Sequence, residues 1–311
     1  MKTFDADAVR AALPWAELIA AIEALFVAGA DVPQRQALTI THTGGEDGTL
    51  LLMPAWIGGD SIGVKAVTLF PANTKRGIST ISAAYLLFDG ATGAIRAAMD
   101  GDAITVRRTA ATSAAAAKYL ARTDARRLLI IGTGQLSANL AEAHAAVRAY
   151  DSIEIYGRSA DKAGAVVADL ARNGIAAIVA TDLEASVRRA DTISCCTSAT
   201  VPVLKGAWLR PGCHVDLVGS FKDDMRESDD DVVRGASIFV DARPGALLSG
   251  DLSQPIRAGM ITEASILGDF RALASGAHPG RRSAGEITLF KSVGNAIEDL
   301  AAARLVSQPD R

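Results

Sequence analysis

The sequence is poor in aromatic residues, in cysteine and in net charge, and each shortage argues against a class of function. Phe, Trp and Tyr make up 5% of the 311 residues, which disfavours a stacking platform for nucleic acid or a carbohydrate cleft. A net charge of −3 leaves no basic footprint for nucleic acid. The cysteines, Cys195, Cys196 and Cys213, match no metal-ligand spacing, so we expect reduced, buried thiols and no metal site.

Targeting and membrane signals are also missing. No uncharged run approaches the roughly 18 residues that a membrane span needs. The N-terminal segment MKTFDADAVRAALPW lacks an apolar core with a cleavage site, and its Asp5 and Asp7 oppose a transit peptide. We therefore expect a cytoplasmic protein that neither spans a membrane nor binds nucleic acid.

The first hundred residues combine one helix with a mostly antiparallel or mixed sheet. Residues 14–29 have apolar positions at helical spacing and stop at Gly29, a natural C-terminal signal. Residues 36–43 and 48–58 flank the glycine-rich segment GGEDG, a pattern typical of a β-hairpin. Residues 61–71 and 79–101 predict further strands.

From residue 105 onward the pattern changes to that of an α/β protein. Residues 105–121 are alanine-rich and helical, and a polar break follows them. From Leu128 the sequence alternates between short apolar strands and amphipathic helices up to about residue 241. This alternation predicts a doubly wound parallel sheet of the Rossmann type.

A glycine motif lies between the first of these strands and its helix. The first glycine permits a tight turn, the second lets the backbone approach a pyrophosphate, and the third position needs only a small side chain. Serine meets that last demand almost as well as alanine. We therefore predict a dinucleotide site with the pyrophosphate at the helix N-terminus. The motif consists of Gly132, Thr133, Gly134, Gln135, Leu136 and Ser137.

The end of the next strand bears on which dinucleotide binds. An NAD site is expected to carry an acidic residue there for the ribose hydroxyls. This sequence instead has Arg158 and Ser159, a cation and a hydroxyl suited to a 2′-phosphate. Glu154 lies inside the strand, where we expect it to pair with another side chain. NADPH is thus the predicted cofactor, with NADH as the weaker alternative.

Several segments resemble the ornithine cyclodeaminase/μ-crystallin family over nearly the whole chain. They are VKAVTLFPANTKRG, VRRTAATSAAAAKYLA, GTGQLSANLAEAHA, VDLVGSFKDDMRESDDD and ITLFKSVGNAIEDLAAARLV, in family order. Within the family, GTGQL, GSF…MRE and FKSVG are most similar to bacterial Δ1-pyrroline-2-carboxylate and Δ1-piperideine-2-carboxylate reductases. The resemblance implies a homodimer. It also implies a Rossmann domain, residues 114–290, inserted in a discontinuous α+β substrate and dimerisation domain, residues 1–113 plus 291–311.

The same resemblance implies roles for individual residues. Lys65 and Arg108 match substrate-side positions, and Arg35 is the third such cation. Arg107 lies beside Arg108, and if only one of the two is functional we favour Arg108. Val293 falls where the returning chain meets the substrate and the nicotinamide. The remaining positions match places where the family approaches the cofactor: Thr80, Arg108, Thr109, Thr197, Ser220 and Ser292.

The chemistry of a cyclic imino acid suits these residue types. Such a substrate carries a carboxylate beside a C=N bond, and converging cations would orient that carboxylate. Each charge-assisted hydrogen bond contributes about 1.5–3 kcal/mol, and a bidentate arginine also fixes the plane of the substrate. Hydride transfer needs such positioning from a protein, because the cofactor carries the redox chemistry.

Ser220 differs from the residue that deaminating family members have at this position, and this difference points to one reaction. Family members that deaminate amino acids have an aspartate shortly after the strand-ending glycine, whereas this chain has Ser220 there and Asp223 and Asp224 further on. A serine can hold a hydrogen bond but is a poor base at neutral pH. We therefore predict NADPH-dependent reduction of Δ1-pyrroline-2-carboxylate and/or Δ1-piperideine-2-carboxylate to L-proline or L-pipecolate.

Two questions stay open at this stage. The proton donor is either Lys65 or a water held by Ser220. Alternative functions are an ornithine cyclodeaminase, an alanine-dehydrogenase-like oxidoreductase, or a non-enzymatic NADPH-binding protein of the μ-crystallin kind.

Overall fold

A computed structural model describes residues 1–43 and 45–308, so Gly44 of the predicted hairpin turn lies outside the described residues. The chain forms two compact units. The mixed-sheet unit comprises residues 1–108 and the segment from Ala296 onward, and the parallel-sheet unit comprises Thr109–Asn295. The expected α/β class, with a Rossmann-type parallel sheet, is confirmed.

The unit boundaries differ from the expected ones by five residues at each junction. We expected changes at 113/114 and 290/291, whereas the units change at 108/109 and 295/296. The first junction falls inside one continuous helix, α3 (Gly101–Leu120), which gives the sequence no signal there. At the second, residues 292–294 are hydrogen-bonded to Asp241 and so stay with the parallel-sheet unit.

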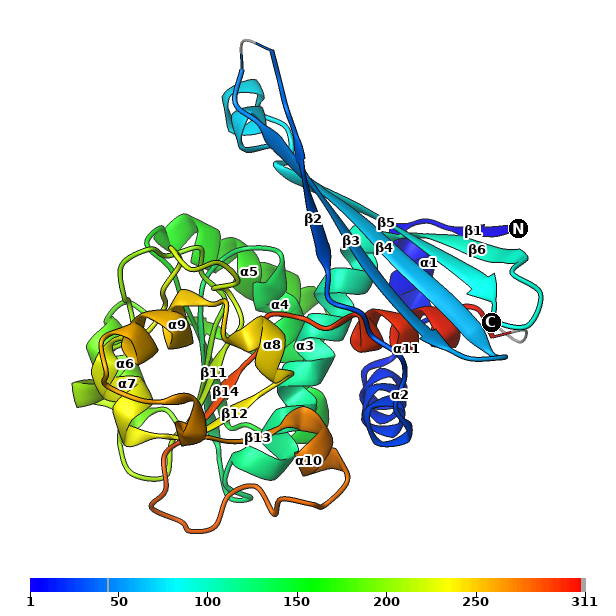
Figure 1. Ribbon diagram of the computed structural model, residues 1–311. Coiled ribbons are helices and arrows are strands. Elements are labelled where there is room, and N and C mark those ends of the chain that lie inside the picture. The colour runs from blue at the N-terminus through cyan, green and yellow to red at the C-terminus, as the bar shows by residue number, and fades with distance from the viewer. Residues whose placement is uncertain (44, 309–311) are drawn as a thin grey trace. The chain divides into compact units, whose positions relative to one another are not determined.

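The mixed-sheet unit has six strands in the order β1-β6-β5-β4-β3-β2 (Figure 1). Only the β1–β6 pair is parallel, and the other neighbours are antiparallel. A 3-10 turn, Pro71–Arg76, joins β4 to β5. The strands are β1 (Lys2–Phe4), β2 (Gln36–Ile40), β3 (Gly48–Ile57), β4 (Ser61–Leu69), β5 (Ile81–Asp89) and β6 (Ile95–Asp100).

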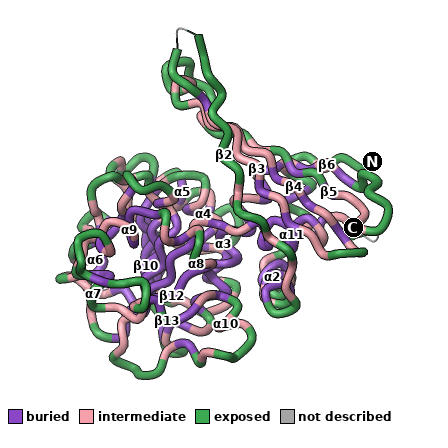
Figure 2. The backbone as a smooth tube through the Cα atoms, in the orientation of Figure 1, coloured by how far each residue is buried: buried purple, intermediate pink, exposed green. Residues whose placement is uncertain are grey.

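The helices of this unit are α1 (Ala6–Ala11), α2 (Trp15–Ala28) and α11 (Ala296–Val306). The predicted helix 14–29 corresponds to α2, which Pro14 precedes. It ends at Gly29, whose φ of 86° is a conformation that glycine adopts at little cost. Helix α11 packs against β3, β4 and β5 on one side and α2 on the other. Its residues are almost all buried (Figure 2).

The two faces of this sheet differ. Lys65 of β4 pairs with Tyr85 of β5, and both side chains are buried. Because side chains alternate along a strand, the neighbouring pair Val64 and Leu86 lies on the opposite face. Leu86 is 37% exposed there. The unit therefore has one covered face with a buried lysine and one apolar face that is partly exposed.

The parallel-sheet unit has eight strands in the order β13-β12-β14-β11-β10-β7-β8-β9, all parallel. Strands β7 and β10 are the point where the order reverses, and ligands of such sheets bind outside the carboxyl ends there. Buried residues concentrate in the central strands (Figure 2). The strands are β7 (Arg127–Ile131), β8 (Ser152–Tyr156), β9 (Ile178–Val179), β10 (Thr192–Cys195), β11 (His214–Leu217), β12 (Ser237–Val240), β13 (Ile266–Asp269) and β14 (Thr288–Lys291).

The helices of this unit connect the strands and cover the sheet. Among the helices in the described part of the chain, none combines the length and the hydropathy needed to cross a membrane. The helices are α4 (Leu136–Val147), α5 (Ala160–Arg172), α6 (Leu183–Arg189), α7 (Asp230–Gly235), α8 (Arg243–Ala246), α9 (Gly250–Arg257) and α10 (Phe270–Ala274), with 3-10 turns at Gly206–Trp208 and Glu263–Ser265.

Candidate active site

The glycine turn lies between β7 and α4, at the reversal point of the parallel sheet. Gly132 has a φ of 135°, and a Cβ there would lie 2.7 Å from the Cys196 sulfur. A Cβ on Gly134, by contrast, would meet nothing within 4 Å. The second glycine therefore faces open space in front of the first turn of α4. That arrangement fits a pyrophosphate at a helix N-terminus.

Ser137, in place of the third glycine, is fully buried. Its hydroxyl oxygen lies 3.4 Å from the sulfur of Cys196, which follows β10. The side chain therefore fills the contact between α4 and the end of the neighbouring strand. This contact requires a small residue, which is the role that we predicted for serine at this position.

The end of β8 approaches the same turn. A Cβ on Gly157 would lie 2.4 Å from the Thr133 side chain, so a glycine is needed there for close approach. Arg158 is exposed. Ser159 caps α5 by accepting a hydrogen bond from the Lys162 backbone at 3.3 Å. The predicted 2′-phosphate residues thus lie one strand away from the glycine turn.

Glu154 pairs away from this site, as expected for a residue inside β8. Its carboxylate accepts hydrogen bonds from Arg189 at 2.6 and 2.8 Å and from Ser186 at 2.8 Å. It is therefore occupied by a structural ion pair, and the prediction that it binds another side chain is confirmed.

Glu227 joins the loops that follow β10 and β11. One carboxylate oxygen accepts hydrogen bonds from the Thr197 backbone at 2.7 Å and from its hydroxyl at 2.9 Å. The other accepts the backbone N–H groups of Gly219 at 2.7 Å and Ser220 at 3.3 Å. One fully buried side chain thus sets the path of both loops that carry predicted cofactor residues.

A buried ion pair between Lys291 and Asp251 holds the backbone of Glu227 in place. Lys291 on β14 lies 3.1 Å from the Asp251 carboxylate and donates a hydrogen bond to the Leu217 carbonyl. Asp251 also accepts the Glu227 backbone N–H at 2.8 Å. Burial and the nearby Asp251 raise the pKa of Glu227, whereas Lys291 and the backbone N–H groups of Thr197 and Gly219 favour its charged form. The network lies at the carboxyl ends of β10, β11 and β14.

Ser220 is fully buried within its own unit. Its hydroxyl donates to the Met225 carbonyl at 2.6 Å, and its oxygen lies 2.6 Å from the Ser249 hydroxyl. Since a hydroxyl has one proton to donate, these contacts leave Ser220 acceptor capacity rather than a free proton. Ser220 nevertheless lies beside Thr197 at the carboxyl ends of the strands, where the sequence placed it.

Asp241 holds the segment that contains Ser292 and Val293. One oxygen of its buried carboxylate accepts the Ser292 hydroxyl at 3.2 Å and the backbone N–H groups of Val293 and Gly294, each at 2.8 Å. The chain that leaves β14 is thereby bent and fixed before α11 begins.

A compact cluster of opposite charges forms in the mixed-sheet unit. The Lys65 ammonium lies 2.8 Å from Asp299 Oδ1 and 3.2 Å from the Thr105 hydroxyl. Arg108 donates from Nε to the same Asp299 oxygen at 2.8 Å and from Nη1 to Glu298 at 2.7 Å. Lys65, Arg108, Glu298 and Asp299 are all buried. The structure therefore brings together two of the three cations that we predicted for the substrate carboxylate.

These ion pairs shift the acid–base properties of the cluster. Burial lowers the pKa of Lys65 from 10.5 to about 8, although Asp299 opposes that shift. Burial would raise the pKa of Asp299, but Lys65 and Arg108 outweigh it and the net shift is downward. The same carboxylates raise the pKa of Arg108 despite its burial. Lys65 is thus the member that can change its charge near neutral pH.

Two other predicted residues, Arg35 and Thr80, belong to the mixed-sheet unit. Thr80 lies five residues before Tyr85, about 17 Å along β5 from the cluster. Arg35 precedes Gln36, which pairs with Leu52 of β3, so continuing that antiparallel register places Arg35 in the row that contains Met53 and Lys65. Two strand spacings of about 4.8 Å separate the backbones of that row. Thr80 directly precedes β5, and its carbonyl accepts the Phe70 N–H at 2.8 Å.

Arg107, Arg108 and Thr109 are successive residues of α3. Thr109 follows Arg108 and is buried in the parallel-sheet unit. Arg107 instead donates to the Leu13 carbonyl at 2.6 Å and stacks 3.5 Å over the Trp15 ring. These contacts give Arg107 a packing role, which favours Arg108 as the substrate-side arginine.

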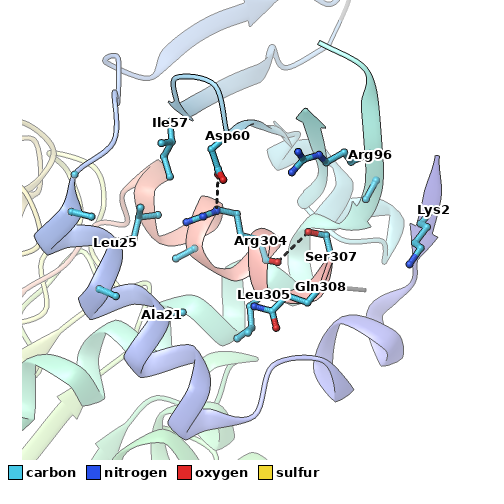
Figure 3. A pocket seen from close by; sticks show the side chains of 15 residues that line it. Lys2, Ala21, Leu25, Ile57, Asp60, Arg96, Arg304, Leu305, Ser307 and Gln308 are labelled. Carbon is cyan, nitrogen blue, oxygen red and sulfur yellow. Dashed lines mark hydrogen bonds and ion pairs between the residues drawn. The ribbon is translucent and has the colours of Figure 1, made fainter. Parts of the chain in front are cut away.

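A separate hollow of about 920 Å³ lies within the mixed-sheet unit, near α2 and the end of α11 (Figure 3). Its charged side chains are largely paired, with Arg304 lying 3.1 Å from Asp60 and Arg96 bonded to Asp89. Its lining contains none of the predicted site residues. We therefore do not assign this hollow to the reaction.

The sequence analysis did not identify the acidic residues of the site. Asp299, Glu227 and Asp241 bind partners that are 234, 30 and 52 positions away in the chain. No local spacing could reveal such pairs. The available signal was weaker: each lies in a motif quoted for the family resemblance or directly after a buried strand.

Comparison with known proteins identifies the family. A family model described as ornithine cyclodeaminase/mu-crystallin family matches residues 4–309. The chain belongs to this family. The resemblance predicted from the sequence motifs is therefore confirmed.

Relatives within the ornithine cyclodeaminase/mu-crystallin family include a Δ(1)-pyrroline-2-carboxylate reductase from Paracoccus denitrificans. It is 39% identical over 300 residues, covering 95% of this chain and 93% of that protein. The structure of Thermococcus litoralis Δ(1)-pyrroline-2-carboxylate reductase in complex with NADH and L-proline has a TM-score of 0.92 and 33% identity, over 99% and 96% of the two chains. An archaeal alanine dehydrogenase dimer with bound NAD has a TM-score of 0.90 and 29% identity, over 99% and 95%.

Proposed function

We propose that the protein is an NAD(P)H-dependent reductase of cyclic imino acids. Its substrates are Δ1-pyrroline-2-carboxylate and/or Δ1-piperideine-2-carboxylate, and its products are L-proline and L-pipecolate. The observation that carries the proposal is the buried pair of Lys65 and Arg108, fixed on one Asp299 oxygen in a chain of this family. The relatives named as pyrroline-2-carboxylate reductases support the same reaction.

The residues of the parallel-sheet unit fit a nicotinamide dinucleotide. Gly132 and Gly134 would admit the pyrophosphate to the N-terminus of α4, because one takes the turn conformation and the other faces open space. Arg158 would bind a 2′-phosphate, and this assigns NADPH as the preferred cofactor over NADH. When bound, the reduced nicotinamide supplies the hydride. Gln135, Leu136, Thr197 and Ser292 complete the proposed contacts.

Lys65 and Arg108 would bind the substrate carboxylate, with Arg35 as a third cation and Val293 as an apolar contact. Two cations that converge on one carboxylate fix both the position and the plane of the ring. Positioning of this kind contributes a large part of the rate of a transfer reaction.

Lys65 is the better candidate for the proton donor. A pKa of about 8 keeps the ammonium mostly protonated at neutral pH while leaving it able to release a proton. The Ser220 hydroxyl proton is directed to the Met225 carbonyl, so Ser220 can hold a water only through its acceptor sites. The proton from Lys65 would go to the ring nitrogen, and the lysine would regain it from solvent.

The decisive experiment is to mix the protein with NADPH and each cyclic imine and to follow the absorbance of the reduced nicotinamide. We expect oxidation that depends on the imine, with L-proline or L-pipecolate as the product by chromatography. Absence of oxidation with either imine would refute the proposal. Lys65→Met should abolish turnover while NADPH still quenches protein fluorescence.

The alternative functions are distinguished in the same assay. The likeness to the archaeal alanine dehydrogenase makes an amino-acid dehydrogenase the second candidate. That activity would require ammonia together with a 2-keto acid. A cyclodeaminase would release ammonia from ornithine without net cofactor oxidation, and a binding protein of the μ-crystallin kind would bind NADPH without turnover.

We also propose that the protein is a homodimer formed through the open face of the mixed sheet. This face carries Leu52, Val64, Leu86 and Phe88 on adjacent strands, and a contiguous apolar surface of this kind is typical of an interface. The likeness to an enzyme described as a dimer supports this assignment. Light scattering should give twice the mass of one chain, and Leu86→Arg should lower it. Ile178→Arg, at an exposed apolar residue of β9, should not.

A further inference from the structure

We propose that Asp299 is a positioning residue of the reaction, which holds Lys65 and Arg108 in one arrangement and maintains the positive charge of Lys65. The inference rests on the proposed function, since it assigns those two cations to the substrate carboxylate. Asp299 itself need not touch the substrate. It would act through the two side chains that do.

The geometry of the cluster supports this role. A single oxygen, Asp299 Oδ1, accepts from the Lys65 ammonium and from Arg108 Nε, each at 2.8 Å. Lysine and arginine side chains have many rotamers, so holding both costs conformational entropy unless a fixed acceptor orders them before the substrate arrives. Asp299 lies on α11, which packs directly against the strand that carries Lys65. The acceptor is therefore fixed by the fold rather than by a loop.

The charge balance gives Asp299 a second effect. Lys65 and Arg108 carry two positive charges, and Asp299 and Glu298 carry two negative ones, all in a buried place. Burial alone disfavours the ammonium form of a lysine, and an adjacent carboxylate favours it. Asp299 has the largest favourable effect on Lys65, whereas Glu298 has a smaller one and lies against Arg108 instead.

The charged and titratable groups around Lys65 are few. Asp102 and Arg108 approach it from α3, Glu298 and Asp299 from α11, and Tyr85 from β5. Its partner on β3 is the neutral Met53. Arg108 lowers the pKa of Lys65, and burial keeps the Tyr85 phenol protonated by raising its pKa. Asp299 is therefore the group whose removal should change the protonation of Lys65 most.

Among the described residues, Asp299 pairs with no cation other than Lys65 and Arg108. Its second oxygen, Oδ2, and the buried Tyr85 hydroxyl have no hydrogen-bond partner among the described residues. Tyr85 is closely packed, because a Cβ on Gly63 would lie 1.9 Å from its hydroxyl. All the ionic contacts of Asp299 thus go through Oδ1 to the two proposed substrate-binding residues.

The test is the pH profile of kcat/KM for the imine in the wild type and in Asp299→Asn. The wild type should lose activity above about pH 8, where Lys65 becomes neutral. In Asp299→Asn this alkaline limb should move to lower pH by one unit or more. A shift of one unit lowers kcat/KM about tenfold at any pH above both midpoints. The loss should appear in KM, because Lys65 binds the substrate carboxylate, and in kcat, because it is the proposed proton donor.

Three variants make the result specific. Asp60→Asn removes a carboxylate that pairs with a cation of the same helix, Arg304 of α11, at an exposed place, and it should leave the profile unchanged. Glu298→Gln should raise KM with a smaller shift of the limb. Lys65→Arg should lower kcat, because a guanidinium is a poor proton donor at these pH values. Its residual activity should show no alkaline limb, and adding Asp299→Asn should not restore one.

Asp299→Glu provides a second test in case Asp299→Asn does not fold. It keeps the charge but displaces the carboxylate by one methylene, so KM should rise several-fold while the limb stays at the wild-type pH. An unchanged KM in Asp299→Glu, or an unmoved limb in a folded Asp299→Asn, would overturn the proposal.

Failure of the proposed function can be told apart from failure of this inference. If the wild type oxidises NADPH with neither imine, the proposed function fails. Calorimetry with pyrrole-2-carboxylate, a planar ring carboxylate that cannot accept hydride, then tests the carboxylate site without turnover. Asp299→Asn should weaken its binding about tenfold or more at pH 8, and equal affinities would overturn the role of Asp299.

Discussion

The Ser137 hydroxyl lies 3.4 Å from the Cys196 sulfur, and this contact joins the first turn of α4 to the strand beside it. Ser137 occupies the place of the third glycine of a dinucleotide fingerprint and is fully buried. Burial also raises the pKa of Cys196 to about 12, so the thiol stays protonated. The contact shows that this position is limited by size rather than by a glycine conformation.

Ser137→Ala should therefore leave the NADPH Michaelis constant unchanged within about twofold, because the lost contact is a weak neutral hydrogen bond. Ser137→Leu should lower the free energy of unfolding by about 1–3 kcal/mol, the usual cost of overpacking. It should also raise the Michaelis constants for NADPH and NADH alike, since it displaces the turn itself. Urea unfolding and initial rates measure both effects.

Ala146→Leu serves as the control for Ser137→Leu, because Ala146 is an exposed residue of the same helix. It should alter neither stability nor cofactor binding. If Ser137→Leu behaves like Ala146→Leu, the position tolerates bulk and the packing role is wrong.

Glu227→Gln should loosen both loops that Glu227 joins, because it removes hydrogen-bond acceptors for their backbones. The carboxylate accepts hydrogen bonds on both oxygens from Thr197, Gly219 and Ser220, whereas an amide can accept on one side only. Leaving a buried donor unpaired costs about 1–3 kcal/mol, so stability should fall by at least that amount. We expect kcat/KM to fall about tenfold, which corresponds to a rise of about 1.4 kcal/mol in the activation free energy.

Glu263→Gln, at an exposed glutamate, is the matched control and should change neither property. A Glu227→Gln protein with wild-type stability and kinetics would show that the two loops hold their path without this side chain.

The glycine turn and its helix were predictable because their signals are local. A short apolar strand, two glycines and an amphipathic helix lie within some twenty residues, and β7 and α4 follow that pattern. Strand β13 was not predicted, and neither was β1, which has only three residues. Such short strands exist because they pair with a neighbour in space, which periodicity does not report.

The candidate site likewise has residues that local motifs predict and residues that only the fold reveals. Lys65 and Arg108 could be named from motifs, but their common partner Asp299 lies 234 and 191 positions away, respectively. An acidic residue at the start of a helix is ordinary in a sequence. Only the fold shows that this one is buried against two cations and not exposed as a favourable helix-end charge.

Arg158→Ala should raise the Michaelis constant for NADPH far more than that for NADH. Arg158 is exposed after β8. A charge-assisted bond to a phosphate contributes about 1.5–3 kcal/mol, so a loss of tenfold or more is expected for NADPH. Arg172→Ala, an exposed arginine at the end of α5 that pairs with Asp169, is the control. Equal effects on the two cofactors would refute the 2′-phosphate role.

His214 should make the protein sensitive to mild acid. It is fully buried on β11, with its Nδ1 3.0 Å from the Thr288 hydroxyl. Burial, reinforced by His144, Arg281 and Arg148, lowers its pKa well below 6.5. The folded protein therefore keeps His214 neutral at pH values where the unfolded chain binds a proton. The stability that this contributes is fully present above pH 6.5 and is lost as the pH falls towards the folded pKa.

Measuring unfolding by urea between pH 7.5 and 5 tests this expectation. One additional proton bound by the unfolded chain corresponds to a slope of about 1.4 kcal/mol per pH unit below pH 6.5. His214→Asn can keep a hydrogen bond to Thr288 but cannot titrate, so its stability should fall less steeply than that of the wild type. His42→Asn, at an exposed histidine, should retain the wild-type slope. Parallel curves for the wild type and His214→Asn would mean that other groups cause the acid sensitivity.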